Sequence, residues 1–159
     1  MSFNQTCAAA RPTLVNSALG SRRSITVSLT QFFAKIGAPL KNTRWSWGAV
    51  REDGTVILRV WQDRKIKHDG ALYMQLSHLQ KYGEAQDNLG YMERLDHIRL
   101  INGGAKCYMV MCLAKDAEIS PREILSFNKN NLFLGGKLLE IDSDWFIEIA
   151  ASIPVQSAT

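Results

Sequence analysis

The sequence predicts an α+β fold in which a mixed, mostly antiparallel twisted sheet, or a partly open barrel, is flanked by two to three helices. Residues 44–63 contain two alternating apolar runs joined by Asp53-Gly54, a pattern typical of a β-hairpin. Residues 88–102 have apolar side chains at helical spacing, and residues 107–114 form the continuous apolar run of a buried strand.

A single α+β domain is expected over residues 25–153. The chain has 159 residues, of which 46% are hydrophobic and 21% charged, and this size and composition suit one folded core. Residues 1–24 are rich in Ser, Ala and Arg, so we expect a disordered basic tail, although an organelle transit peptide or a vector-encoded extension has a similar composition. Residues 154–159 are expected to fray.

The stretch SLTQFFAKIG predicts a short amphipathic helix. Ser28 and Gln31 have the spacing of a capping box, and Gly37 and Pro39 stop the helix. Four apolar side chains share one helical stripe and are expected to pack on the body of the domain: Leu29, Phe32, Phe33 and Ile36.

The hairpin is expected to pair residues 44–51 with residues 55–63 across a two-residue turn at Asp53-Gly54. Opposed residues then have numbers that sum to 107. One face is expected to be core: Trp45 opposite Gln62, Trp47 opposite Val60 and Ala49 opposite Leu58. The other face is expected to be mixed: Arg44 opposite Asp63, Ser46 opposite Trp61, Gly48 opposite Arg59 and Val50 opposite Ile57.

Further elements follow along the chain. A third strand is preferred near residues 71–77, although Leu72, Leu76 and Leu79 also fit a helix. Lys65, Lys67 and His68 are expected in the loop before it. The helix over residues 88–102 ends at Gly103-Gly104, and Glu93 and His97 lie four residues apart, where they can pair across one turn.

The C-terminal third predicts one more helix and three strands. Ser120, Pro121 and Glu123 have the spacing of a helix start in SPREILSF. The strands are expected at residues 132–134, 137–141 and 145–150, with turns at Gly135-Gly136 and Ser143-Asp144.

Charge is unevenly distributed along the chain. The formal net charge is +4, no acid precedes Glu52, and residues 35–67 hold eight basic and three acidic residues. A basic half favours a polyanionic partner such as nucleic acid, because phosphate contacts release counterions. The alternative is that these charges serve solubility alone.

We therefore expect a non-catalytic nucleic-acid-binding module, with DNA preferred, that uses the basic face of the hairpin. An exposed Trp between arginines suits base stacking beside phosphate contacts. The alternative is that another element covers Trp61. The candidate contacts are Arg44, Arg59 and Trp61, with Arg51, Arg64, Lys65 and Lys67 for phosphate.

Two other functions remain open at this point. The sequence has no phosphate-binding loop, nucleophile elbow or zinc-protease helix, but Asp53, Asp63 and Lys65 could form a small magnesium-dependent nuclease site. Alternatively, an exposed aromatic face could serve protein interaction or a homodimer.

Cys7, Cys107 and Cys112 make an odd number of cysteines, and the last two fall in one apolar run where a strand points them to opposite faces or buries them singly. They are expected to be reduced core residues, which favours the cytoplasm. No zinc-site spacing and no membrane-spanning apolar run occur in the sequence, so we expect neither a metal site nor a cofactor nor a membrane partner.

The stretch RWSWGAVREDGTVILRVWQDR, followed by GYMERLDHIRLINGG and SPREI, resembles small bacterial modules that accompany HNH-type nucleases in restriction and defence proteins. The resemblance covers about residues 30–150. It implies a DNA-facing module. The chain has no HNH residues of its own, so the resemblance does not extend to cleavage.

Overall fold

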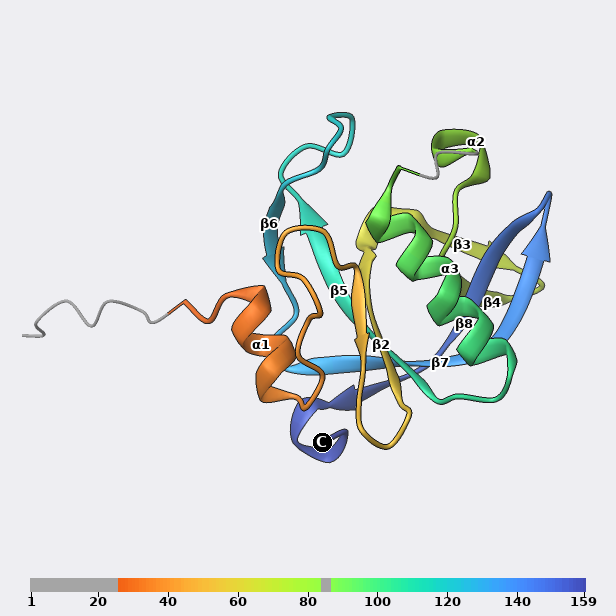
Figure 1. The fold of residues 1–159 in the computed structure, drawn as a ribbon. Coiled ribbons are helices and arrows are strands. Elements are labelled where there is room, and N and C mark those ends of the chain that lie inside the picture. Colours follow the sequence, from red (N-terminus) through yellow and green to blue (C-terminus); the bar gives the residue numbers. More distant parts are fainter. Residues whose placement is uncertain (1–25, 84–86) are drawn as a thin grey trace, which may run out of the picture.

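The computed structural model describes residues 26–83 and 87–159, so the tail expected at residues 1–24 lies outside the described part. The described residues form one mixed, mostly antiparallel eight-stranded sheet with three helices, and the sheet does not close into a barrel (Figure 1). The α+β prediction is confirmed. The helices are α1 (Leu29–Lys35), α2 (Leu79–Tyr82) and α3 (Leu89–Asn102). The strands are β1 (Gly48–Val50), β2 (Val56–Trp61), β3 (Lys65–His68), β4 (Ala71–Gln75), β5 (Cys107–Ala114), β6 (Ile124–Phe127), β7 (Asn131–Ile141) and β8 (Asp144–Pro154).

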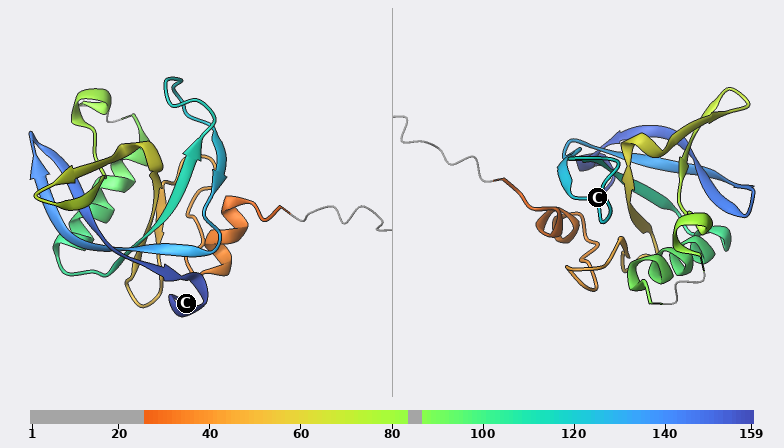
Figure 2. Two further views of the ribbon diagram at one scale, coloured as in Figure 1. Left: turned by 180° about the vertical axis from the view of Figure 1, so that it is seen from behind. Right: turned by 90° about the horizontal axis from the view of Figure 1, so that it is seen from above.

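The sheet contains one parallel pair, β2 with β5, next to its β1 edge. The strand order is β1-β2-β5-β7-β8-β4-β3, with β6 pairing β5, and every other pair is antiparallel. Figure 2 shows the β3–β4 hairpin at the side of the molecule away from α1. Because β2 and β5 run in the same direction, their carboxyl ends lie at the same edge of the sheet.

Strands β2 and β5 are buried on both faces, so the domain has two core clusters. On one face Ile57 and Val110 pack with Phe33 of α1. On the other face Leu58 and Met109 pack with residues of α3. Alternation along β5 places Cys112 in the first cluster and Cys107 in the second, which confirms that the two thiols point to opposite faces.

Helix α1 forms as the sequence predicts. The Ser28 hydroxyl accepts a hydrogen bond from the Gln31 amide, and the Gln31 side chain accepts one from the Ser28 amide. This reciprocal capping satisfies two backbone donors at the start of the helix. Phe32, Phe33 and Ile36 are buried against the sheet.

The expected fraying of residues 154–159 is wrong. Pro154 ends β8, residues 155–157 form a short 3₁₀ helix, and Ala158 is buried. Arg51 explains this order, because its guanidinium donates to the carbonyls of Ile36 and Ala158. The side chain therefore connects the end of α1 to the C-terminal segment.

The first hairpin is present, but its expected register is wrong by one residue. Gly48 lies opposite Leu58 rather than Arg59, because the loop has three residues, 52–54. The Arg51 amide donates to the Thr55 carbonyl, and Gly54 follows with φ of +87°. A three-residue loop of this kind places a glycine in the left-handed region. The strand pairing is also shorter, since residues 44–47 precede β1.

The expected loop over Lys65, Lys67 and His68 is wrong, because these residues form β3 and pair with β4. Asp69 and Gly70 both have positive φ, which is the backbone of a two-residue hairpin turn. A second Asp-Gly pair thus marks a second hairpin. The strand expected near residues 71–77 is confirmed as β4.

Helix α3 is confirmed, and the Asn88 side chain caps it by accepting from the Tyr91 amide. The expected pair of Glu93 and His97 does not form. Glu93 instead accepts from the Ser46 hydroxyl and the Trp47 amide. His97 is buried, and burial lowers its pKa.

The helix expected from Ser120 is wrong, because residues 124–127 form β6 against β5, after a cis peptide between Ser120 and Pro121. The turn expected at Gly135-Gly136 is also wrong, since β7 continues through both glycines with an irregular register. Glycine is common in β-bulges as well as in turns, because both need backbone conformations that other residues rarely adopt. The last turn lies one residue earlier than expected, at Asp142-Ser143.

Candidate anion-binding pocket

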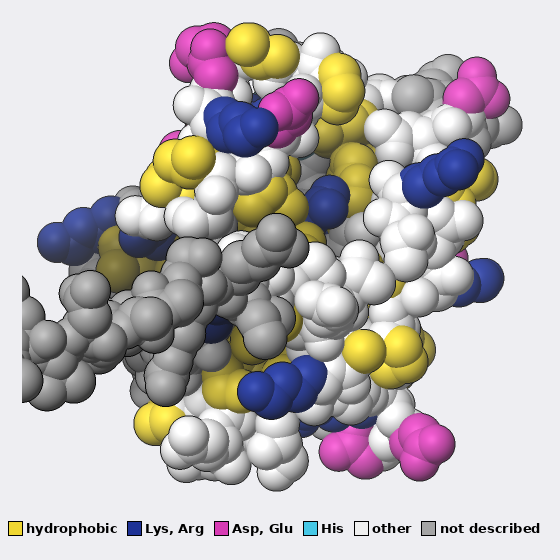
Figure 3. Space-filling model, turned by 90° about the vertical axis from the view of Figure 1, so that its left-hand side faces the viewer, with side chains coloured by type: hydrophobic (Ala, Val, Ile, Leu, Met, Phe, Trp, Pro, Cys, Tyr) yellow, Lys and Arg dark blue, Asp and Glu magenta, His cyan; other side chains and the backbone are white. Residues whose placement is uncertain are grey.

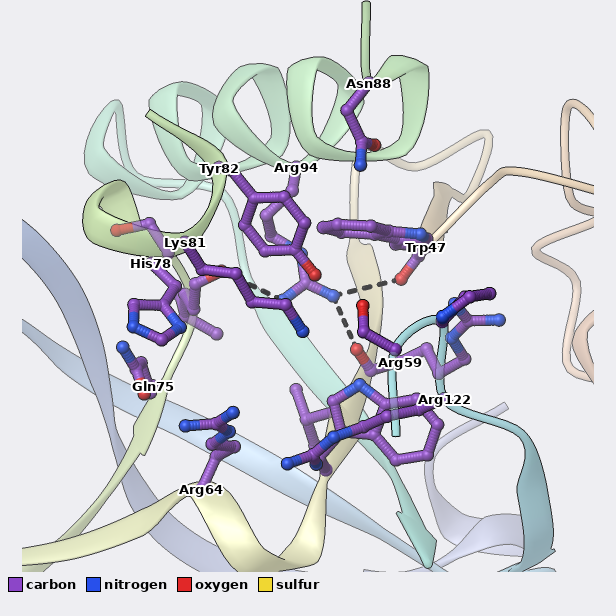
Figure 4. A pocket seen from close by; sticks show the side chains of 16 residues that line it. Trp47, Arg59, Arg64, Gln75, His78, Lys81, Tyr82, Asn88, Arg94 and Arg122 are labelled. Carbon is purple, nitrogen blue, oxygen red and sulfur yellow. Dashed lines mark hydrogen bonds between the residues drawn. The ribbon is translucent and has the colours of Figure 1, made fainter. Parts of the chain in front are cut away.

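A pocket with a volume of about 190 Å³ lies at the carboxyl ends of the two parallel strands (Figure 4). In open sheets this edge is where ligand crevices form, because the chain leaves neighbouring strands in diverging directions. Six separate parts of the chain contribute to the wall: Trp47, residues 59–61 with Arg64, residues 75–78, residues 81–82, Asn88 with Arg94, and residues 120–122.

Among the described residues, the wall of this pocket carries cations and no acids. Five of its residues have a permanently positive side chain: Arg59, Arg64, Lys81, Arg94 and Arg122. They come from different elements and surround one hollow (Figure 4). Asp63 lies outside the wall, binds Arg122 through two hydrogen bonds of 2.7 and 2.8 Å, and lies 4.0 Å from the Arg64 Nε atom. The bond with Arg122 lowers the pKa of Asp63.

Arg94 is the most unusual of the five, because its side chain leaves the buried stripe of α3 and remains only 5% exposed. It donates to the backbone carbonyls of Leu76, Trp47 and Arg59, as the dashed lines in Figure 4 show. Its Nε atom has no partner within residues 26–83 and 87–159. Burial lowers its pKa to about 10, so it is still charged at neutral pH.

Arg59 lies beside Arg94 and is half-buried, and partial desolvation lowers its pKa. In the part of the chain that the structure describes, its guanidinium makes no ion pair. Its charge lies 5.9 Å from the centre of the Trp61 ring, and that of Arg122 lies 5.4 Å from the same ring. Two cations therefore hold the Trp61 indole between β2 and the loop before β6.

Trp47 and Tyr82 form a second aromatic wall, with ring centres 5.2 Å apart. Tyr82 also stacks on Tyr91 of α3 at 4.8 Å. Glu93 positions Trp47 by accepting from its backbone amide at 2.9 Å. The pocket thus combines guanidiniums with flat aromatic side chains.

The structure brings together three of the seven expected contact residues. Arg59, Trp61 and Arg64 line the pocket. Arg44 is exposed in the loop before β1, Arg51 binds backbone carbonyls elsewhere, and Lys65 and Lys67 are exposed on β3. Trp61 is half-buried, neither the open stacking platform that was expected nor a fully covered core residue.

Among the Lys, Arg, Trp and Tyr residues of the pocket, sequence reasoning missed five: Trp47, Lys81, Tyr82, Arg94 and Arg122. Of these, only Arg94 could have been identified from the sequence. It lies between Tyr91 and Ile98 on the apolar side of its helix, where a charged residue is unusual. Trp47 was expected in the core opposite Val60, but its carbonyl accepts from the Arg59 amide. Arg122 reaches the pocket across a long separation in sequence.

The residues considered for a nuclease have other bonding partners. The Asp53 carboxylate accepts from the Thr55 amide in the hairpin loop, and Asp63 binds Arg122. Within residues 26–83 and 87–159, no group of three or more His, Cys, Asp or Glu side chains could hold a metal ion. Cys107 and Cys112 are buried free thiols, and burial raises the pKa of each to about 12.

Cationic side chains do not form a continuous patch on the visible part of the α1 side of the molecule (Figure 3). Lys and Arg are separated there by apolar and uncharged side chains, and acidic side chains lie at opposite ends of the view. Positive charge is therefore more concentrated in the pocket than on this face.

Comparison of the chain with protein-family models, with curated proteins and with solved structures finds no match. The resemblance to modules that accompany HNH-type nucleases stays an expectation. Among the described residues, no helix has the length and apolar character needed to cross a membrane.

Proposed function

We propose that this chain is a nucleic-acid-binding module whose pocket receives one nucleotide of the bound strand. The observation that carries this proposal is the adjacent pair of guanidiniums of the buried Arg94 and the half-buried Arg59, neither of which has an ion-pair partner in the described residues. A buried charge without a counter-charge costs free energy. A bound phosphate would supply that counter-charge.

The chemistry of the wall favours a nucleotide over a simple anion. Guanidiniums bind phosphate oxygens with paired, charge-assisted hydrogen bonds. Aromatic rings such as Trp47 and Tyr82 offer faces on which a base can stack. A nucleotide has both an anionic group and a flat ring, so it matches both halves of the pocket.

Nucleic acid is the proposed source of this nucleotide, with DNA preferred. The basic half of the chain supports a polyanion, and the resemblance to restriction and defence modules supports DNA. We also propose that binding is non-catalytic, since Asp53 and Asp63 are engaged by Thr55 and Arg122. The two reduced, buried thiols fit a cytoplasmic protein.

Titration of labelled single-stranded and duplex DNA by fluorescence anisotropy tests the proposal. Wild-type protein should bind, and Arg59→Gln should weaken binding by roughly tenfold, because it removes a charge-assisted hydrogen bond from a desolvated site. Arg64→Gln should also weaken binding and serves as a second variant, because its partly exposed side chain lies at less risk of disturbing the fold.

Arg44→Gln is the matched control, since it removes the same charge from an exposed loop position outside the pocket. It should change affinity far less than the pocket variants. Equal losses for Arg44→Gln and Arg59→Gln would show that overall charge, and not the pocket, governs binding. A wild-type protein that binds no DNA at low salt would end the proposal.

A further inference from the structure

The charge of the pocket exceeds what one internal phosphate of a nucleic acid can balance. An internal phosphodiester carries one negative charge and two free oxygens, whereas a terminal phosphate carries about −1.5 to −2 at neutral pH and three acceptor oxygens. Five cationic side chains line the pocket, and Asp63 lies within ion-pair distance of two of them, Arg122 and Arg64, so their summed charge still exceeds that of one carboxylate and one monoanion. A dianion therefore fits this wall better than a monoanion.

Donors and acceptors in the wall point to the same chemistry. In the part of the chain that the structure describes, the wall has no carboxylate, and three of its backbone carbonyls, those of Trp47, Arg59 and Leu76, already accept from Arg94. What remains for a ligand is mainly hydrogen-bond donors. A terminal phosphate offers only acceptors when it is fully ionised, so it satisfies these donors without leaving one of its own unpaired.

The shape of the pocket favours a chain end. Arg94 is 5% exposed and closes the inner side beneath α3, while Lys81, Arg64 and Arg122 approach the hollow from different elements (Figure 4). An internal nucleotide would have to flip into the hollow with both flanking segments of the strand held at the entrance, which costs unstacking free energy. A terminal nucleotide has only one flanking segment, and its base can rest against Trp47 or Tyr82.

We propose that the pocket recognises a phosphomonoester at the end of a nucleic-acid strand, in preference to internal phosphodiesters. This inference rests on the proposed function, because it assumes that the ligand belongs to nucleic acid. The cations would then recognise strand ends, and Arg59, which lies over the Trp61 ring and has no ion-pair partner among the described residues, is the guanidinium most available to phosphate oxygens.

Binding of one short single-stranded DNA sequence in three forms tests the inference: with a 5′-phosphate, with a 3′-phosphate and with neither. Wild-type protein should bind one phosphorylated form roughly tenfold more tightly than the unphosphorylated form, because the extra charge makes further charge-assisted hydrogen bonds. Arg59→Gln should remove most of this preference, and Arg44→Gln should retain it.

The outcomes separate the inference from the proposed function. Equal binding of all three forms overturns the inference and leaves nucleic-acid binding standing, whereas no binding of any form overturns both. Inorganic phosphate and a nucleoside monophosphate serve as competitors. If the monophosphate binds as tightly as the phosphorylated strand, the phosphomonoester chemistry is supported, but the nucleic-acid source is overturned.

Discussion

At the scale of single residues, the pocket depends on how Arg59 and Arg94 are held without an acid. Backbone carbonyls accept from Arg94 on three sides, and their partial negative charge offsets part of the cost of burial. The Trp61 ring does the same for Arg59. Neither contact removes the net charge, so both guanidiniums remain able to attract an anion.

Replacing Asp63 with Asn should strengthen anion binding, because the carboxylate pairs with Arg122 and Arg64 and so competes with a ligand for two of the pocket's cations. Its ion pair with Arg122 is partly exposed, so the gain should be modest, at most about fivefold for a pair worth under ~1 kcal/mol. Asp142→Asn, in the β7–β8 turn, is the matched control. Anisotropy titration of a short DNA strand measures the change.

This substitution also separates binding from catalysis. A magnesium-dependent nuclease that used Asp63 would lose cleavage in Asp63→Asn, whereas a binding pocket gains affinity. Loss of both binding and plasmid nicking in this variant would contradict the binding account.

Cys107 and Cys112 should react slowly with a thiol reagent in the folded protein. Burial raises the pKa of each to about 12, so almost no thiolate exists at neutral pH. A Cys7→Ser variant leaves only these two thiols to be counted. Their reaction should become fast and complete when the protein is unfolded in denaturant. Fast reaction in the native state would show that the central strand opens.

At the scale of elements, the start of α3 fixes the position of Trp47. Gly90 lies so close to the loop before β1 that an added Cβ would clash with the Trp47 indole and would lie 2.5 Å from the Trp45 carbonyl oxygen. Glu93, one turn further along, accepts from the Trp47 amide. Helix α3 therefore fixes the position of Trp47, which forms one aromatic wall of the pocket.

Gly90→Ala should weaken DNA binding and reduce the free energy of unfolding by ~1–3 kcal/mol, the usual cost of overpacking. Denaturant titration and anisotropy measure the two effects. Gly103→Ala at the other end of the same helix is the control, since a Cβ there would make only ordinary contact, at 3.4 Å from the Arg99 carbonyl. Unchanged binding in Gly90→Ala would show that Trp47 is not part of the site.

Elements set by local signals were predicted well, and those set by distant contacts were not. The capping box at Ser28 and the periodicity over residues 88–102 are local, so α1 and α3 formed where expected. The Asp53-Gly54 pair fits both a two-residue and a three-residue loop, and the longer loop shifted the register by one. Residues 124–127 form a strand because they pair with β5, and no local sequence pattern indicates this pairing.

At the scale of the whole molecule, the pocket exists only because the topology assembles it. The parallel pairing of β2 with β5 brings Trp61 and the loop carrying Arg122 to one edge, and the chain between those strands adds Arg64, Lys81 and Arg94. Composition indicated a basic half of the chain but not where its charges converge. Only three of the seven expected contact residues line the pocket, and the hairpin face that was expected to carry them was predicted in the wrong register.

The salt dependence of DNA binding tests the central claim most directly, because phosphate contacts make affinity fall linearly on a plot of log affinity against log salt. Wild-type protein should show a clear negative slope, and Arg64→Gln should make that slope shallower by about one. Arg44→Gln should leave the slope nearly unchanged. Binding that ignores salt, or a slope that Arg44→Gln lowers as much as Arg64→Gln, would contradict a cationic pocket that binds nucleotide phosphate.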